Sequence, residues 1–403
     1  MAFPVGTNRA FQYGLGIFTL TALIGLFNAT KIIGDLDQNT LLTHLHSGTL
    51  GWISMGVFGI ALALFARNGV AGPYVSLSAL ATAAYVIAFW SGNFYARAIF
   101  GTVMLGTIFG WWAWVAYRSS QEGFGKLSNP KFAMLLGLTT LVIGSTVGVI
   151  IQIQFALNAT SDQTAALIGT HASAQVGGYL ILVATGIIEW FLIGEKRTTG
   201  GMIQSVLLFL AGLSLALGSL LGIQPLLLVT NILQLAATVM VVVRLGPALM
   251  KTAWTATGGI RHAAIVPLYL VIGVLLVVAL VQQVVAANGD FSKVPPGLIH
   301  SLDHTFFIGV MTNTLFGAIL LATADRPRVW PWADHVVFWG LNVGVLSFTA
   351  VLVFVGSSSG AAAFSHPVAY TAPIMGLSAL LGIVTFSLRL ASSPAPMRAP
   401  AAA

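Results

Sequence analysis

Three histidines lie close to the start of long apolar stretches of the chain, at intervals that indicate one shared site. They are His46, His171 and His304, separated by 125 and 133 residues. An ionisable side chain inside a membrane-spanning stretch is costly, and it usually serves a function there. Neutral imidazole binds iron, copper and zinc. The three positions therefore predict a metal-binding centre.

Two further histidines extend this set, and their spacing limits what each can bind. His44 lies two residues before His46, so on an α-helix their side chains diverge by about 200° and face opposite sides. They cannot share one metal ion, but they could serve two cofactors on either side of the helix. His300 lies four residues before His304, on the same helix face. This pair could offer two ligands to one metal, or one ligand and a partner for that ligand.

Two carboxylates in the apolar stretches are predicted to act in a proton pathway. Asp303 adjoins His304, where it could accept the second ring N–H of a ligand, serve His300, or carry protons. Glu189 lies near the far end of the stretch that contains His171. Each has a structural alternative: a partly hydrated acid near the outer surface for Asp303, and an interface residue that reaches water for Glu189.

The remaining histidines are His262, His335 and His366, and each stands at the first position of its predicted helix, beside loop residues. Polar residues cost little at such positions. We assign these three to structure or to the membrane interface, so only the five histidines above are candidate ligands.

The composition is that of an integral membrane protein. Of 403 residues, 57% are hydrophobic and 7% are charged, whereas soluble domains carry about 25% charged residues. Apolar runs of about 20 residues span a bilayer as helices, because lipid offers no partner for backbone polar groups. We predict an all-α integral membrane fold with a single domain over residues 1–392 and a disordered tail over 393–403. The twelve predicted spans cover residues 13–33, 43–66, 72–95, 97–118, 130–156, 165–193, 202–221, 224–245, 263–287, 297–323, 333–356 and 367–389.

The net charge of +7 reflects membrane topology. With the N-terminus in the cytoplasm, fourteen of the 17 Lys and Arg residues lie on the inner side and three on the outer side, a strong positive-inside bias. This predicts a multi-pass protein of the plasma (inner) membrane with both termini cytoplasmic. The lipid bilayer, and no nucleic acid, is the partner that the basic residues indicate. The three outer cations are Lys31, Arg97 and Lys293.

The chain contains no cysteine, which narrows the choice of cofactor. Disulfides, iron–sulfur clusters, thiolate-bound haem and covalent haem attachment through Cys-x-x-Cys-His are all excluded. Histidine and methionine remain as haem ligands. Histidines spread over distant helices, within an apolar interior rich in glycine, favour non-covalently bound haem b, one or two per chain.

The chain has an internal repeat with a period of four helices. The predicted second, sixth and tenth spans each place a histidine near the start, then a small or polar residue, then an apolar stretch with glycine. On the derived topology all three spans run from outside to inside. Their histidines therefore lie at one depth, and we predict three pseudo-repeated four-helix units around a shared site in the outer third of the bilayer.

The second predicted span carries the most specific motif in the chain. Residues 44–52 read HLHSGTLGW and are followed by Gly56 and Phe58. This segment resembles the His-x-His-Ser-Gly-x-Leu-Gly-Trp segment of the C-family haem-copper oxidases, in cytochrome c oxidase subunit I, and of their nitric oxide reductase relatives. The twelve spans and the threefold repeat also resemble that superfamily, so the resemblance covers nearly the whole chain in architecture. At the level of residues, only this segment is specific.

The resemblance implies a set of ligands. By position, His46 and His304 would be the axial ligands of a low-spin haem. His300 would face a second haem, and His171 would stand at a copper position or serve that second haem. The chain departs from the family in two ways, because Gly201–Leu208 at the start of the seventh span contains no histidine and the His-x-His pair lies on the second span instead of the tenth. Two of the three copper ligands are therefore missing.

The second departure allows another register of the threefold pattern. In this register His46 would pair with His171. His44 would then face the span that carries His300 and His304. The sequence leaves both registers open.

The resemblance implies a haem-binding protein that acts in electron transfer, or in redox chemistry of oxygen or nitric oxide, with an incomplete copper site. Such an oxidoreductase would take electrons from a cytochrome c or a quinol and would associate with partner subunits. One alternative is a haem- or copper-binding sensor or assembly factor without turnover. Another is a proton-coupled transporter that uses the histidines and Asp303 as a relay.

Overall fold

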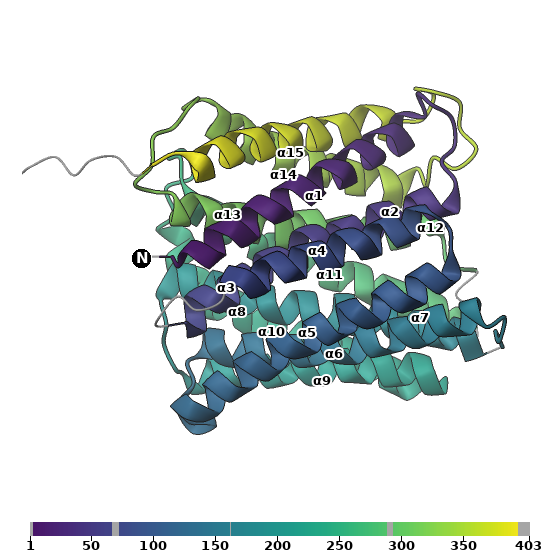
Figure 1. Cartoon of the computed structure of the whole chain (residues 1–403), viewed down its shortest axis with the longest axis horizontal. Helices are drawn as coiled ribbons and strands as arrows, with labels where there is room; N and C mark the ends of the chain where they lie inside the picture. Colours follow the sequence, from purple (N-terminus) through teal and green to yellow (C-terminus); the bar gives the residue numbers. More distant parts are fainter. Residues whose placement is uncertain (1–2, 67–71, 162, 288–292, 394–403) are drawn as a thin grey trace, which may run out of the picture.

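The structure is a computed structural model that describes residues 3–66, 72–161, 163–287 and 293–393 (Figure 1). Over these residues it is all-helical, without a strand, and twelve helices are long and apolar enough to cross a membrane. This confirms the predicted all-α architecture with twelve spans. Of the predicted tail over 393–403, only Ser393 is among the described residues.

Three of the twelve spans in the described part of the chain are interrupted by a π-helical segment, and the other nine are continuous α-helices. The nine are α1 (Val5–Thr30), α4 (Gly72–Trp90), α5 (Phe94–Glu122), α6 (Asn129–Ala156), α9 (Thr199–Leu221), α10 (Gln224–Met250), α11 (Gly259–Ala286), α14 (Ala333–Phe354) and α15 (Val368–Ala391). In the first interrupted span, η1 (Ser47–Ser54) joins α2 (Gln38–His46) to α3 (Met55–Phe65). In the second, η3 (Ala174–Leu180) joins α7 (Gln163–Ser173) to α8 (Ile181–Ile193). In the third, η5 (Thr305–Thr312) joins α12 (Pro296–His304) to α13 (Asn313–Ala322). A short 3-10 turn, η2 (Phe124–Lys126), joins α5 to α6.

Polar residues extend the first helix beyond its apolar run. The first helix, α1, begins at Val5, whereas the first span was predicted to begin at residue 13. The reason is a packing contact: Thr7 is fully buried, and its hydroxyl donates a hydrogen bond of 2.7 Å to the carbonyl oxygen of Gly59 on α3. A polar side chain with such a partner stays in the helix at little cost.

The helices lie side by side along the long axis of the molecule (Figure 1). The start of α1 and the end of α15 lie at one end, together with α3, α8 and α13. The histidine-bearing helices α2, α7 and α12 lie at the opposite end. The candidate ligands therefore gather at the end remote from the N-terminus.

The three interrupted spans form the core of the bundle. Their apolar windows are 83%, 83% and 78% buried, whereas those of the other nine spans are 33–56% buried. The core spans are the predicted second, sixth and tenth, which carry the histidines. The nine remaining helices therefore enclose the helices that present the candidate site.

A π-helical segment follows the histidine in each core span. η1 begins directly after His46, η5 directly after His304, and η3 three residues after His171. π-Helices are rare and occur mostly at functional sites. The repeat seen in the sequence is therefore matched by a departure from α-helical geometry at equivalent places.

Burial changes sharply along the core spans. Nearly every residue of α3, α8 and α13 is buried, but in α2 only Thr43 is buried, in α7 only Thr164 and Thr170, and in α12 only three residues. The half of the core remote from the histidines is therefore close-packed. The histidine half keeps accessible surface on helices that other helices surround.

Hydrogen bonds between side chains join the three core spans about two turns further along each span than the histidines. The residues eight positions after the three histidines are Ser54, Tyr179 and Thr312. The Tyr179 hydroxyl donates to the Ser54 hydroxyl at 3.2 Å, and the indole N–H of Trp52 donates to the Thr312 hydroxyl at 3.0 Å. These buried bonds fix the rotation of the core helices relative to one another.

Glycines let an outer helix touch a core span. A Cβ built on Gly212 of α9 would lie 2.6 Å from the Cα of Gly178 in η3, closer than real Cβ atoms come. Gly212→Val is expected to push α9 outward and to lower the free energy of unfolding by about 1–3 kcal/mol, the usual cost of overpacking. Thermal unfolding in detergent measures the change. Gly106→Val is the control because a Cβ there meets nothing within 4 Å, and equal stability of the two variants would contradict the close contact.

Candidate functional site

Asp37 fixes the start of the helix that presents His44 and His46. Its carboxylate accepts hydrogen bonds from the backbone N–H groups of Asn39 and Thr40, at 2.8 and 3.1 Å, and from the Thr40 hydroxyl at 2.6 Å. These bonds, first of all the one from the Thr40 hydroxyl, lower the pKa of Asp37. The helix therefore begins with a well-formed N-cap at the histidine end of the bundle.

His46 is held between its own helix and an aromatic wall on α4. Its Nδ1 lies 2.8 Å from the carbonyl oxygen of Leu42. Its ring stacks on Phe89, with centroids 3.8 Å apart, and lies edge-on to Tyr85 at 5.8 Å. The buried Arg97 guanidinium lies 4.6 Å from the centroid of the Phe89 ring. These contacts give the imidazole one orientation.

His44 points from α2 towards α1 and α12. Its Nδ1 lies 2.8 Å from the carbonyl oxygen of Thr21. Gly25 makes room for the ring, because a Cβ at Gly25 would lie 2.9 Å from Cε1 of His44. Across the core, the His44 and His304 rings have centroids 6.4 Å apart and planes inclined by 27°.

His304 is oriented by its own helix and by α14. Its Nδ1 lies 2.8 Å from the carbonyl oxygen of His300, and its ring packs on Phe348 with centroids 4.6 Å apart. His300 is exposed and lies one helical turn before His304 on α12. Asp303 is half-buried, and no hydrogen bond or ion pair joins it to the described residues. The carbonyl of His300, and not the carboxylate of Asp303, therefore fixes the tautomer of His304.

His171 occupies a similar niche between α7 and α6. Its Nδ1 lies 2.8 Å from the carbonyl oxygen of Gly144. A Cβ at Gly148 would lie 2.8 Å from that same Nδ1, so the glycine is required for the ring to fit.

The five histidines thus fall into two groups. The first contains His44 and His304, whose rings are neighbours, with His300 on the helix of His304, and the second consists of the remaining two, His46 and His171. The contact of His44 with the span that carries His304 is the one expected in the second of the two registers that the sequence left open.

In four of these histidines the same ring nitrogen carries the proton. His44, His46, His171 and His304 each hold Nδ1 at 2.8 Å from a backbone carbonyl oxygen. A carbonyl only accepts, so Nδ1 carries the proton and Nε2 keeps its lone pair. Within the described residues no hydrogen bond occupies these Nε2 atoms, and none of them is buried without a partner. They are therefore accessible, which is the arrangement of imidazoles that bind a metal.

One pair of candidate ligands has its rings close together, namely His44 and His304. Among the described residues, no group of three or more His, Cys, Asp or Glu side chains could hold a metal ion. Two paired imidazoles could serve as ligands of one metal or haem iron.

Glu189 lies at the opposite end of the bundle, in a buried ion pair. Its carboxylate accepts two hydrogen bonds from the Arg244 guanidinium, at 2.5 and 3.0 Å, and one from the Asn129 amide at 2.6 Å. Arg244 also donates to Gln204 at 2.7 Å. The network joins α8, α10, α6 and α9, so the structure gives Glu189 a role in holding helices together. Neither Asn129 nor Arg244 could be singled out from the sequence pattern.

His262 has a structural place in the core, at the fourth position of α11 instead of the predicted first. It is fully buried, because α11 begins three residues earlier than this histidine. Its Nδ1 is bonded to the Asn313 side chain at 2.9 Å, and its Nε2 is sealed in the core without a partner among the described residues. His335 is bonded through Nδ1 to Arg261 at 3.2 Å, and His366 lies in the loop before α15. None of the three joins the two histidine groups.

Comparison with protein-family models and with curated proteins finds no match for this chain. The functional conclusion therefore depends on the chemistry of the site itself. That chemistry is two groups of imidazoles, four of them with fixed tautomers, at one end of a twelve-helix bundle.

Proposed function

We propose that this protein binds haem b non-covalently through paired histidines and acts in electron transfer. The observation that carries the proposal is the common tautomer of His44, His46, His171 and His304, whose Nε2 atoms are free and accessible. His262, which has a structural role, differs from these four histidines. Its Nε2 is buried in the core and has no hydrogen-bond partner among the described residues.

The spacing of one pair supports ligation of a single iron from two sides. The ring centroids of His44 and His304 lie 6.4 Å apart. A metal–imidazole bond is about 2 Å long and the ring centroid lies about 1 Å behind the nitrogen, so two axial imidazoles place their centroids about 6 Å apart. The observed separation agrees with that value.

The residues around the ligands orient them. Each carbonyl that accepts from Nδ1 fixes the ring and raises the basicity of Nε2. Phe89 and Phe348 pack on the rings of His46 and His304 and restrict their rotation. Bound haem would supply one-electron redox chemistry. The exposed His300 would hold a second haem, which would supply the redox chemistry of oxygen or nitric oxide.

The proposal extends to fold and orientation. Twelve helices with histidines on three core spans are what the resemblance to haem-copper oxidase subunit I implies. The positive-inside bias would place the histidine end at the outer face of the plasma membrane, where a cytochrome c or a quinol would deliver electrons. The proposal includes no complete copper site, because Gly201–Leu208 at the start of the seventh span contains no histidine.

Absorption spectroscopy of the purified protein tests haem binding. Reduction with dithionite is expected to produce the α-band of a low-spin b-type haem, and the pyridine haemochrome assay is expected to measure one or two haems per chain. A variant with His44, His46, His171 and His304 all replaced by alanine is expected to lose this band. His366→Ala, at the same end but outside both groups, is expected to keep it.

Folding and haem binding are separated by a second measurement. Far-ultraviolet circular dichroism shows whether the fourfold variant keeps its helices. Folded wild-type protein that takes up no haem, even when haemin is added during purification, would contradict the proposed function.

A further inference from the structure

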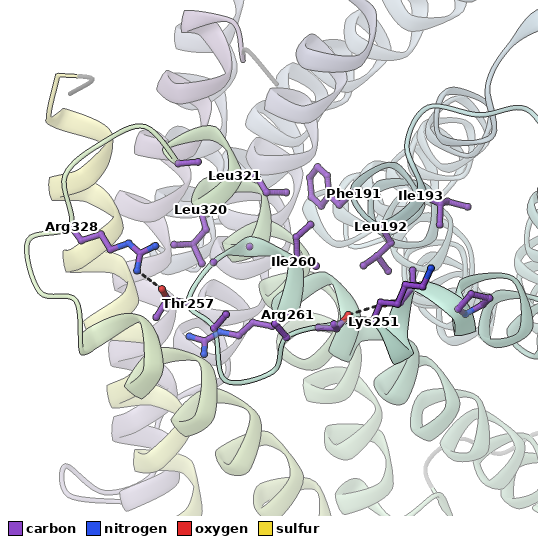
Figure 2. A pocket seen from close by; sticks show the side chains of 18 of the residues that line it. Phe191, Leu192, Ile193, Lys251, Thr257, Ile260, Arg261, Leu320, Leu321 and Arg328 are labelled. Carbon is purple, nitrogen blue, oxygen red and sulfur yellow. Dashed lines mark hydrogen bonds between the residues drawn. The ribbon is translucent and has the colours of Figure 1, made fainter. Parts of the chain in front are cut away.

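A cavity of about 840 Å³ (Figure 2) lies beside the ends of α8 and α13, at the end of the bundle opposite to the histidines (Figure 1). The end of α8, the connection between α10 and α11, and the ends of α13 and α15 surround it. Basic side chains from segments far apart in the chain converge on this cavity. They are Lys196, Lys251, Arg261, Arg328 and Arg389.

The cavity also has an extended apolar wall. Phe191, Leu192 and Ile193 form one part of it, and Ile260 and Leu320 lie on another side (Figure 2). A cavity that served only a small hydrated ion would not need this apolar lining. The two kinds of surface together suit a ligand that is part anionic and part apolar.

The positive charge is only partly neutralised by the protein. Asp334 lies 3.5 Å from Nη1 of Arg389 and 3.8 Å from Nε of Arg328. The backbone carbonyl of Asp334 also accepts a hydrogen bond from Arg261. Within the described part of the chain, no carboxylate forms an ion pair with either of the other two cations, Lys196 and Lys251. The cavity therefore carries an excess of positive charge.

Two of the arginines have N–H groups that lack a hydrogen-bond acceptor. Arg261 is 2% exposed and Arg389 is 4% exposed. Nε of Arg261 has no hydrogen-bond partner among the described residues, and Nη1 of Arg389 has only the ion pair with Asp334 at 3.5 Å. Leaving a buried, charged donor unsatisfied is costly. An anion in the cavity would offset the charge of these guanidinium groups.

The start of α11 adds further donors. Gly258 and Gly259 line the cavity, and the helix that begins there has no side-chain cap. The first N–H groups of a long helix favour a negative charge, because they lack intrahelical partners and carry the positive end of the helix dipole. The uncapped helix start thus reinforces the arginines.

We propose that this cavity binds the head group of an anionic phospholipid, with its apolar part along the hydrophobic wall. Arginine guanidinium groups match the geometry of phosphate oxygens. The volume lies within the range of about 300–1,000 Å³ of cavities that hold organic ligands, well beyond the size of a free phosphate ion. Basic pockets between membrane helices on the cytoplasmic side bind such head groups, and the positive-inside bias predicts this end to be cytoplasmic. The proposal is independent of haem binding.

Lipid titration of the intact, detergent-purified protein tests the proposal. Phosphatidylglycerol is expected to stabilise the protein against thermal unfolding more than phosphatidylcholine. One cation at an anionic lipid surface contributes about fivefold in affinity. The double variant Lys251→Gln, Arg328→Gln is therefore expected to bind phosphatidylglycerol about 25-fold more weakly. Both side chains are accessible, so the fold should be retained.

A charge-matched variant serves as the control. Arg9→Gln combined with Lys126→Gln removes two exposed cations at the same end that do not line the cavity, and it is expected to bind phosphatidylglycerol as the wild type does. Equal weakening by both double variants would overturn the site. Equal stabilisation by phosphatidylcholine would overturn the preference for an anionic lipid. Stabilisation by inorganic phosphate as strong as that by phosphatidylglycerol would overturn the lipid as the ligand.

Discussion

Replacing either His44 or His304 with alanine is expected to remove the same haem and to leave the other in place. The centroids of the two rings lie 6.4 Å apart, and each ring has its Nε2 free. An iron held by two axial imidazoles loses its low-spin state when either is removed. In a protein with two haems, each single variant is therefore expected to lose about half of the low-spin signal per chain.

The pattern among the variants decides between the two registers. The double variant of His44 and His304 is expected to lose no more signal than either single variant, because both residues serve one iron. His46→Ala and His171→Ala are expected to remove the second haem in the same way. Haem content is measured by the pyridine haemochrome assay, and electron paramagnetic resonance of the oxidised protein identifies the low-spin species. If His46→Ala and His304→Ala instead removed one common haem, the proposed pairing would be incorrect.

Glu189→Ala is expected to destabilise the protein by about 3–5 kcal/mol, since it leaves the charge of Arg244 buried without its partner. The side chains of the pair are 3% and 15% exposed, and Asn129 and Gln204 complete the network. The loss would appear as a lower midpoint of thermal or denaturant unfolding in detergent. It should leave the haem spectrum of the remaining folded protein unchanged, because the pair lies at the end remote from the histidines.

Glu195→Ala provides the matched control for this variant. Glu195 also forms an ion pair, at 2.7 Å from Lys131, but its side chain is 40% exposed. Exposed pairs contribute about 0–1 kcal/mol. Replacing both Glu189 and Arg244 with methionine should cost less than Glu189→Ala alone, because no charge is then left unpaired. A Glu189 variant as stable as the Glu195 variant would exclude the structural role assigned here.

The twelve spans could be predicted from sequence because each apolar run is long enough to cross a bilayer and the loops between runs are short. Helix ends were harder to predict. Thr7 extends α1 through a bond to the backbone of Gly59, a contact between segments that no local pattern reveals. The π-helical segments were not predicted either, because an apolar run reads the same with or without the altered hydrogen bonding.

The candidate ligands could be found from sequence, but their grouping could not. Helical geometry places His44 and His46 on opposite faces. Which neighbour each one meets depends on the rotation of three core helices, and this rotation is set by contacts such as the stacking of His46 on Phe89. Gly25 and Gly148 could have indicated which helices the imidazoles contact. Both are small residues on neighbouring helices, and a larger side chain at either would overlap the ring of His44 or His171.

The abrupt change in burial along the core spans also determines where charge can travel. α3, α8 and α13 are apolar and close-packed, with Glu189 as their single charged residue, and that residue is neutralised by Arg244. Moving one charge across a membrane against 100 mV costs about 2.3 kcal/mol. This close-packed half of the core separates the histidines from the opposite face of the membrane. Electrons that entered and left a redox centre at the histidine end would therefore cross almost none of the membrane potential. Such a protein would work at the same rate in an energised and in a depolarised cell.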